Sequence, residues 1–155
     1  MDSPITIKDI PAQHVLGVRF KTSMAGIGRD IGQGYGEVFG YLQKIGVPPS
    51  GPPTALYYDV EVEGDTIDME VCVPVAGETS GKGEVLGYVL RGGKAATIMY
   101  KGAYNEVGSA YEALFAYIKE NGMALAGPTR EIYLTDPAQV EDPADNLTEI
   151  VFLVE

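Results

Sequence analysis

Apolar residues recur along the chain in two rhythms, one typical of helices and one typical of strands. Two stretches carry apolar side chains at spacings of 4, 3 and 4 residues, which places each set on one face of an amphipathic helix. The sets are Ile31, Tyr35, Val38 and Leu42, and then Val107, Tyr111, Leu114 and Ile118. Both patterns stop just before a glycine, Gly46 or Gly122. Glycine adopts the left-handed conformation that caps a helix, so we predict two helices that end there.

Segments rich in β-branched and aromatic residues flank each predicted helix and favour β-strands. The six segments are residues 14–22, 54–62 and 66–75 in the first half of the chain and residues 94–102, 130–136 and 147–155 in the second. VEGD at 62–65 suits a hairpin turn, and DPAQVEDPADN at 136–146 suits a longer connection. Each half is therefore predicted to be a β-α-β-β unit.

The two halves repeat one another at a constant offset of 76 residues, for example from Tyr57 to Tyr133 (133 minus 57). A fixed offset is the signature of a duplicated unit. We expect a single domain over 1–155, with one repeat over about 4–75, a polar linker over about 76–83 and the second repeat over about 84–155. The predicted fold class is α+β. It consists of duplicated β-α-β-β units with pseudo-twofold symmetry, a curved antiparallel sheet, two helices on one face and a ligand cleft between the halves. We expect the helices on the side of Ile132 and Leu134.

Charge and composition exclude several classes of function. The chain has 11 Lys and Arg against 22 Asp and Glu, a net charge of −11. Because direct nucleic-acid binding needs a basic face, we expect none. Such a field favours cationic partners, although an acidic surface that maintains solubility is the commoner meaning. The chain has no run of about eighteen apolar residues and no secretory signal at its start, so we expect no membrane partner and a cytoplasmic location. With one cysteine, Cys72, and one histidine, His14, the usual zinc sites cannot be assembled, and we expect no metal and no cofactor.

The repeat breaks at one acid on a predicted strand. Glu131 corresponds to Ala55 at the offset of 76, so the scaffold does not require an acid there. Strand alternation places Tyr57 and Tyr133 on the same face as this position, and a carboxylate among phenols suits a flat apolar cation. Desolvation of such a carboxylate would raise its pKa and make it a candidate general base. Alternation by itself favours the commoner alternative, an acid on the solvent face of an edge strand.

Glu70 is a second, weaker candidate for ligand binding. It occupies the same place in the first repeat that Glu149 occupies in the second. An acid that both repeats keep favours a scaffold role, such as hydrogen bonding or solvent exposure.

An ordered set of motifs resembles the GyrI-like family. It consists of EVCVPV at 70–75, YKGAY at 100–104, the helix that ends in IKENG, GPTREIYLTDP at 127–137 and the final LTEIVFLVE. This family is a small-molecule-binding domain, found alone in gyrase-inhibitory proteins and fused to AraC-type and MerR-type transcription regulators. The resemblance spans almost the whole chain, including the duplicated β-α-β-β plan. It implies a ligand cleft between the halves and a buried glutamate at the position of Glu131.

The resemblance also implies a function. In regulators of this type, the acid meets lipophilic cationic drugs among stacked aromatic rings, which Tyr57, Tyr100 and Tyr133 would supply here in the absence of tryptophan. We therefore expect a stand-alone protein that binds hydrophobic, cationic or polycyclic compounds, for multidrug-type recognition, sequestration or effector sensing. The alternative is a hydrolase that opens the cyclopropane ring of alkylating natural products, with Glu131 orienting or activating water. A third hypothesis is an inhibitory contact with DNA gyrase, another topoisomerase, a regulator or another basic protein.

Overall fold

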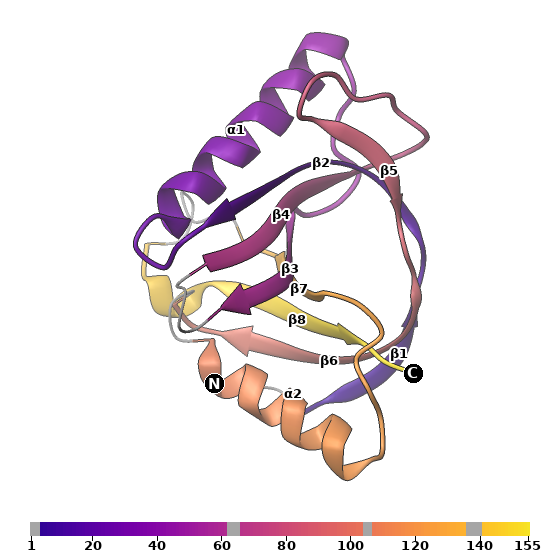
Figure 1. Cartoon of the computed structure of the whole chain (residues 1–155), viewed down its shortest axis with the longest axis vertical. Coiled ribbons are helices and arrows are strands. Elements are labelled where there is room, and N and C mark those ends of the chain that lie inside the picture. Colours follow the sequence, from indigo (N-terminus) through magenta and orange to yellow (C-terminus); the bar gives the residue numbers. More distant parts are fainter. Residues whose placement is uncertain (1–3, 62–65, 104–106, 136–140) are drawn as a thin grey trace. The chain divides into compact units, whose positions relative to one another are not determined.

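The computed structural model describes residues 4–61, 66–103, 107–135 and 141–155 (Figure 1). Its helices are α1 (Ile27–Ile45), α2 (Gly108–Glu120) and a short 3-10 helix, η2 (Pro143–Asp145). Its strands are β1 (Thr6–Ile10), β2 (Gln13–Thr22), β3 (Thr54–Glu61), β4 (Thr66–Val75), β5 (Leu86–Leu90), β6 (Gly93–Lys101), β7 (Thr129–Tyr133) and β8 (Leu147–Leu153). The strands run antiparallel in the pairs β1–β6, β6–β8, β7–β8, β3–β4, β2–β4 and β2–β5. The predicted α+β fold of duplicated units is confirmed.

Strands β1 and β5 are absent from the sequence prediction. Both have five residues, and most of their side chains are exposed or half-buried. The hydrophobic pattern of an edge strand is weak because only one neighbour and one face contribute contacts. The predicted turn at 62–65 lies outside the described residues. So do residues 136–140 of the predicted connection at 136–146.

The chain forms two compact units, which we call unit 1 (residues 1–11 and 92–155) and unit 2 (residues 12–91). The strand order is β1-β6-β8-β7 in unit 1 and β3-β4-β2-β5 in unit 2. The units follow one plan, in which α2, β7 and β8 correspond to α1, β3 and β4. The first strand of each sequence repeat pairs with a strand of the other repeat, since β1 pairs with β6 and β5 pairs with β2.

The strand register makes the correspondence between the units exact to the residue. In unit 2, Ala55 pairs with Val71. In unit 1, Glu131 occupies the place of Ala55 and pairs with Ile150. The duplication seen in the sequence is therefore also a duplication of strand pairing.

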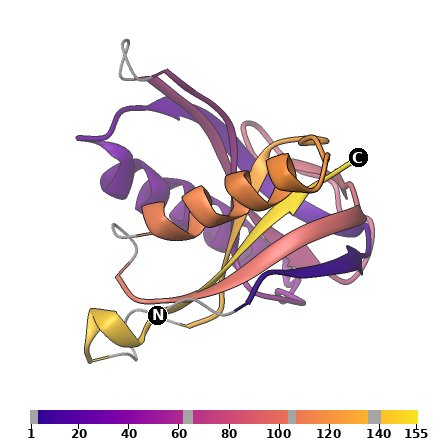
Figure 2. The ribbon, with the colours of Figure 1, turned by 90° about the horizontal axis from the view of Figure 1, so that it is seen from below.

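Helix α2 packs on one face of the unit 1 sheet, along β6 and β8 (Figure 2). Its buried residues Ala110, Leu114 and Ile118 share a hydrophobic cluster with sheet residues that include Ile98 and Ile150. Helix α1 packs in the same way in unit 2, where Val38 and Leu42 join a cluster of residues from β2 and β4.

Our expectation that the helices cover the side of Ile132 and Leu134 is wrong for unit 1. Ile132 lies in a separate cluster with Val151 and Leu153, on the face away from α2, and Leu134 is 42% exposed beyond the end of β7. The helix instead covers the face that carries Glu131. Both faces of this sheet hold an apolar cluster, so alternation along one strand did not distinguish the face that receives the helix.

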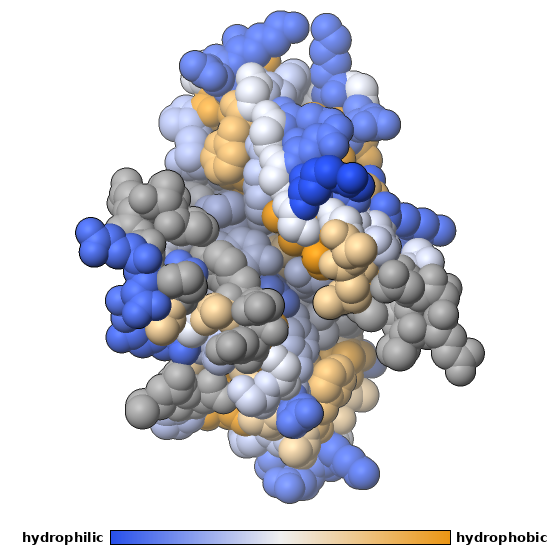
Figure 3. All heavy atoms as spheres, turned by 90° about the vertical axis from the view of Figure 1, so that its left-hand side faces the viewer, coloured by the Kyte–Doolittle hydropathy of each residue, from blue (hydrophilic) through white to orange (hydrophobic). Residues whose placement is uncertain are grey.

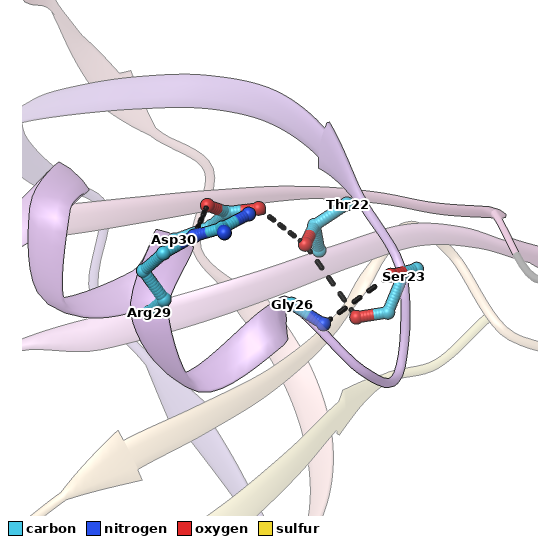
Figure 4. A network of polar contacts seen from close by, with 5 residues as sticks. All are labelled: Thr22, Ser23, Gly26, Arg29 and Asp30. Atoms are coloured by element: carbon cyan, nitrogen blue, oxygen red, sulfur yellow. Dashed lines mark hydrogen bonds and ion pairs between the residues drawn. The ribbon is translucent and has the colours of Figure 1, made fainter.

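Short polar networks and glycines set the ends of α1. In the loop before it, the backbone N–H of Gly26 donates to the Ser23 side chain at 3.2 Å (Figure 4). In the first turn of α1, the Asp30 carboxylate accepts from Thr22 at the end of β2 at 2.6 Å and from Arg29 at 3.1 Å. Both hydrogen bonds lower the pKa of Asp30, and the bond from Thr22 has the larger effect. At the other end, Gly46 has a φ of 74°, and the equivalent Gly122 after α2 has a φ of 67°. The predicted helix ends are confirmed.

The surface is mixed in character. Figure 3 shows hydrophilic side chains over much of one face, with small apolar patches between them. Within the described part of the chain, neither long helix is apolar enough to cross a membrane.

Candidate functional site

Glu131 lies on β7 with its side chain on the face that α2 covers. It is only 6% exposed. Its Oε2 accepts a hydrogen bond from the Tyr111 hydroxyl of α2 at 2.5 Å, and its Oε1 accepts one from the Tyr133 hydroxyl at 3.2 Å. Each carboxylate oxygen is therefore held by a phenol, one from the helix and one from the strand.

Burial raises the pKa of the Glu131 carboxyl, while the hydrogen bonds from Tyr111 and Tyr133 act in the opposite direction. Among the described residues, the ion pairs involve other acids and none involves Glu131. A buried carboxylate without a cation is unfavourable when it is ionised, because two neutral donors compensate only part of the lost hydration. This site can therefore hold a cation or accept a proton.

The equivalent position in unit 2 shows what the scaffold does without the acid. Ala55 is fully buried there. Tyr35, which corresponds to Tyr111, donates its hydroxyl hydrogen bond to the backbone carbonyl of Thr54 at 2.7 Å. The tyrosine on the helix thus finds an acceptor in both units, and the carboxylate in unit 1 is an addition to the common plan.

Aromatic rings extend from Glu131 along α2. The Tyr111 ring lies 5.8 Å from the ring of Phe152 on β8, and Phe115 meets the same ring edge-on at 4.8 Å. Phe115 is 47% exposed, although it is large and apolar. A ligand beside Glu131 would meet a wall that includes aromatic carbon as well as hydroxyl groups.

The sequence prediction missed Tyr111 and Phe115 as site residues. Both belong to the repeated pattern, as counterparts of Tyr35 and Phe39. The signal was present, but placing the helix on the opposite face of the sheet separated these residues from Glu131.

The predicted aromatic residues have different positions. Tyr133 is half-buried and bonds to Glu131 directly. Tyr100 is 5% exposed, lies two strands away on β6 and packs in the core beneath α2. Tyr57 belongs to unit 2, and its place beside Glu131 stays a prediction.

Glu70 has its own pair of phenols within unit 2. It is 5% exposed, and it accepts hydrogen bonds from Tyr58 at 2.8 Å and from Tyr88. Burial, followed by the bond to Glu70, raises the pKa of Tyr58, and burial also raises the pKa of Tyr88. Gly17 makes room for the carboxylate, since a Cβ there would collide with Glu70 Oε2.

The register supports a scaffold role for Glu70. Glu70 pairs with Leu56 and Glu149 pairs with Ile132, so the two acids are equivalent. Tyr88 on β5 bonds to Glu70, and Lys8 on β1 forms an ion pair with Glu149 at 2.6 Å. Each acid thus ties an edge strand to its sheet on the face away from the helix. Glu70 stays the weaker candidate for a ligand contact.

Metal binding has no support within residues 4–61, 66–103, 107–135 and 141–155. No group of three His, Cys, Asp or Glu side chains there could hold an ion.

Comparison with known proteins places this geometry in context. A family model described as the GyrI-like small molecule binding domain matches residues 3–155, which confirms the resemblance seen in the motifs. A search of curated proteins found no match. Among solved structures, the C-terminal domain of EcmrR is 26% identical, with a TM-score of 0.85, and the match covers 98% of this chain and 97% of that chain. EcmrR in a complex with DNA matches with 26% identity and a TM-score of 0.87, and this chain spans 57% of that longer chain.

Two more distant structures share the fold. A hydrolase from Listeria innocua is 13% identical, with a TM-score of 0.74, and the match covers 97% of this chain and 91% of that chain. SAV2435 bound to tetraphenylphosphonium is 18% identical, with a TM-score of 0.69, and the match covers 99% of this chain and 94% of that chain.

Proposed function

Because the chain belongs to the GyrI-like small-molecule-binding domain family, we propose that it binds hydrophobic, cationic or polycyclic compounds and that Glu131 anchors their positive charge. The observation that carries this proposal is a carboxylate that is 6% exposed, bonded only to phenols among the described residues. Unit 2 folds with alanine at the same place, so the acid serves something other than folding.

A cationic ligand would remove the main cost of this arrangement. In the free protein, two neutral donors hold a desolvated carboxylate whose pKa is raised by burial. A cation beside it restores the missing opposite charge in an environment that screens charge poorly, and so favours the ionised form. Binding of a cation and release of the proton from Glu131 are therefore linked.

Aromatic faces would supply the rest of the affinity. Tyr111 and Tyr133 bond to Glu131, and Phe115 contacts the same Phe152 ring that Tyr111 does. In this proposal Tyr57 and Tyr100 complete the wall. Each aromatic face contributes about 0.5 to 2 kcal/mol to a cation through cation-π attraction. A flat or multi-ring cation gains most because it meets several faces at once. SAV2435, which shares the fold, was solved with the lipophilic cation tetraphenylphosphonium.

Affinity for lipophilic cations tests the anchor role. Tetraphenylphosphonium and a set of planar cations would be titrated calorimetrically into the wild type and into Glu131→Gln. Loss of a buried charge partner should weaken binding roughly 10- to 100-fold. Glu149→Gln is a matched control, because Glu149 lies on the neighbouring strand but faces away from α2 and bonds to Lys8. Equal affinity in the wild type and Glu131→Gln would rule out the anchor.

Hydrolysis is the second candidate, and the raised pKa of Glu131 favours it. A carboxylate in such surroundings can accept a proton from water as the water oxygen bonds to a cyclopropane carbon. The strained carbon–carbon bond then breaks, and its electron pair passes into the conjugated carbonyl of the alkylating compound, whose oxygen takes a proton from a tyrosine hydroxyl. Glu131 then returns its proton to that tyrosine, to which it is hydrogen-bonded. Mass spectrometry of such a compound after incubation would show a gain of one water. If turnover persists in Glu131→Gln, or if no such compound is converted, the hydrolase hypothesis fails.

A further inference from the structure

Thr148 on β8 carries a buried hydroxyl that the fold does not use. The residue is fully buried, and its Oγ1 has no hydrogen-bond partner among the described residues. Buried side-chain polar atoms nearly always have a partner, so a lone hydroxyl needs a reason.

The register places Thr148 close to Glu131. Thr148 pairs with Tyr133 on β7, and Ile150, two residues further along β8, pairs with Glu131. Side chains two residues apart on a strand share a face, so Thr148 and Glu131 both lie on the side that α2 covers. Diagonal neighbours of this kind are about 7 to 8 Å apart. The two residues are thus close enough for a ligand of one or two fused rings to contact both.

The repeat shows that the hydroxyl is not required by the scaffold. In unit 2, Phe20 and Tyr57 both pair with Met69, just as Tyr100 and Tyr133 pair with Thr148 in unit 1. Three positions on the helix-covered face are therefore apolar in unit 2 and polar in unit 1. They are Ala55, Met69 and Phe20 in unit 2, and Glu131, Thr148 and Tyr100 in unit 1.

Tyr133 is a neighbour of both groups. It is half-buried, lies directly across from Thr148, and donates to Glu131 at 3.2 Å, the longer of the two phenol bonds.

We infer that Thr148 donates a hydrogen bond to the same ligand whose charge Glu131 holds. The hydroxyl proton needs an acceptor, so the preferred ligands are cations that carry a carbonyl or ether oxygen about one ring away from the charged atom. This inference rests on the proposed binding of cations. It adds a selection rule, because a bare lipophilic cation satisfies Glu131 and leaves Thr148 without a partner.

Matched ligands test the rule. N-benzylquinolinium ions that carry either an acetyl or an ethyl group would be compared, with the group moved to each ring position in turn. The acetyl group has the two carbon atoms of the ethyl group plus a carbonyl oxygen, so only the acetyl group offers an acceptor. For the wild type, the acetyl ligand should bind about 3- to 10-fold more tightly than the ethyl ligand at one ring position. This is the gain in affinity expected from one hydrogen bond between neutral groups.

Three variants separate the hydroxyl from its surroundings. Thr148→Val removes the hydroxyl at nearly constant shape and should abolish the preference for acetyl while leaving the affinity for the ethyl ligand within about 2-fold. Thr148→Ser should keep the preference. Thr97→Val is the control, because Thr97 is also buried in this sheet but faces away from α2, and its hydroxyl bonds to the backbone of Thr6.

The outcomes distinguish this inference from the function on which it rests. Suppose that Glu131→Gln weakens the binding of both ligands. If Thr148→Val then retains the preference for the acetyl ligand, or if the wild type shows no such preference at any ring position, the role of Thr148 is refuted and cation binding stands. If neither ligand binds in a manner that depends on Glu131, both are refuted. A higher melting temperature for free Thr148→Val would support the inference independently, since the variant no longer buries an unpaired hydroxyl.

Discussion

The hydrogen bond from Tyr111 to Glu131 makes a prediction that can be tested without any ligand. Tyr111→Phe removes one oxygen atom and keeps the ring, so the contact between rings 111 and 152, with centroids 5.8 Å apart, is preserved. What is lost is a donor at 2.5 Å from a carboxylate that is 6% exposed. The change in the free energy of unfolding therefore reports on the loss of the Tyr111 hydroxyl, including its bond to Glu131.

The expected magnitude depends on the charge of Glu131. A hydrogen bond to an ionised group contributes about 1.5 to 3 kcal/mol, and a bond between neutral groups contributes about 0.5 to 1.5 kcal/mol. Tyr35→Phe is the matched control, since Tyr35 is the equivalent residue of unit 2 and its hydroxyl donates to a neutral backbone carbonyl at 2.7 Å. Tyr111→Phe should be the more destabilising variant at pH 8, by about 1 kcal/mol or more, which is roughly 2 to 4 °C in melting temperature.

The pH dependence has a definite sign. The Tyr111 bond lowers the pKa of Glu131 in the folded state, so its loss raises that pKa further. Folded Tyr111→Phe therefore holds its proton up to a higher pH than the folded wild type, and its deficit in stability grows as the pH rises through this range. Urea unfolding between pH 4 and pH 8 measures this directly. The reasoning is refuted if Tyr111→Phe and Tyr35→Phe lose the same stability at every pH.

Three further predictions concern other parts of the molecule. Gly34→Ala should destabilise the fold by about 1 to 3 kcal/mol, because the added Cβ would lie 2.7 Å from Val71. Gly36→Ala in the same helix faces open space and should stabilise the fold by up to about 1 kcal/mol. Thermal unfolding of both variants measures the difference, and equal effects would contradict the close packing at Gly34. Glu131→Gln should gain stability relative to the wild type as the pH rises above the ordinary range for a glutamate, because burial raises the folded pKa of Glu131 and the wild type loses stability when this group ionises. Thermal melts of both proteins up to pH 8 measure this, and a variant that instead loses stability relative to the wild type over this range would contradict the reasoning. An inhibitory contact with DNA gyrase or another basic protein would depend on the net charge of −11, so a pull-down that is unchanged by neutralising surface Asp and Glu clusters would exclude it.

Local patterns determined much of this protein from the sequence alone. The spacing of apolar residues located both long helices, and glycines in left-handed conformation end them as predicted. The repeat identified the duplication, and its break at Glu131 marked the acid that turned out to be buried between two phenols. These features are readable because helix periodicity, helix capping and duplication are each recorded within a short stretch or at a constant offset.

Only the tertiary structure decided which groups meet. Strand alternation assigns residues to two faces without saying which face receives a helix, and here both faces of the unit 1 sheet are apolar. The edge strands β1 and β5 pair with segments far away in the sequence, so Lys8 and Tyr88 gave no local sign that they would hold Glu149 and Glu70. Tyr111 became a partner of Glu131 in the same way, because a contact between a helix and a strand depends on packing that no single segment encodes. The sequence thus singled out the acid, and the fold supplied its surroundings.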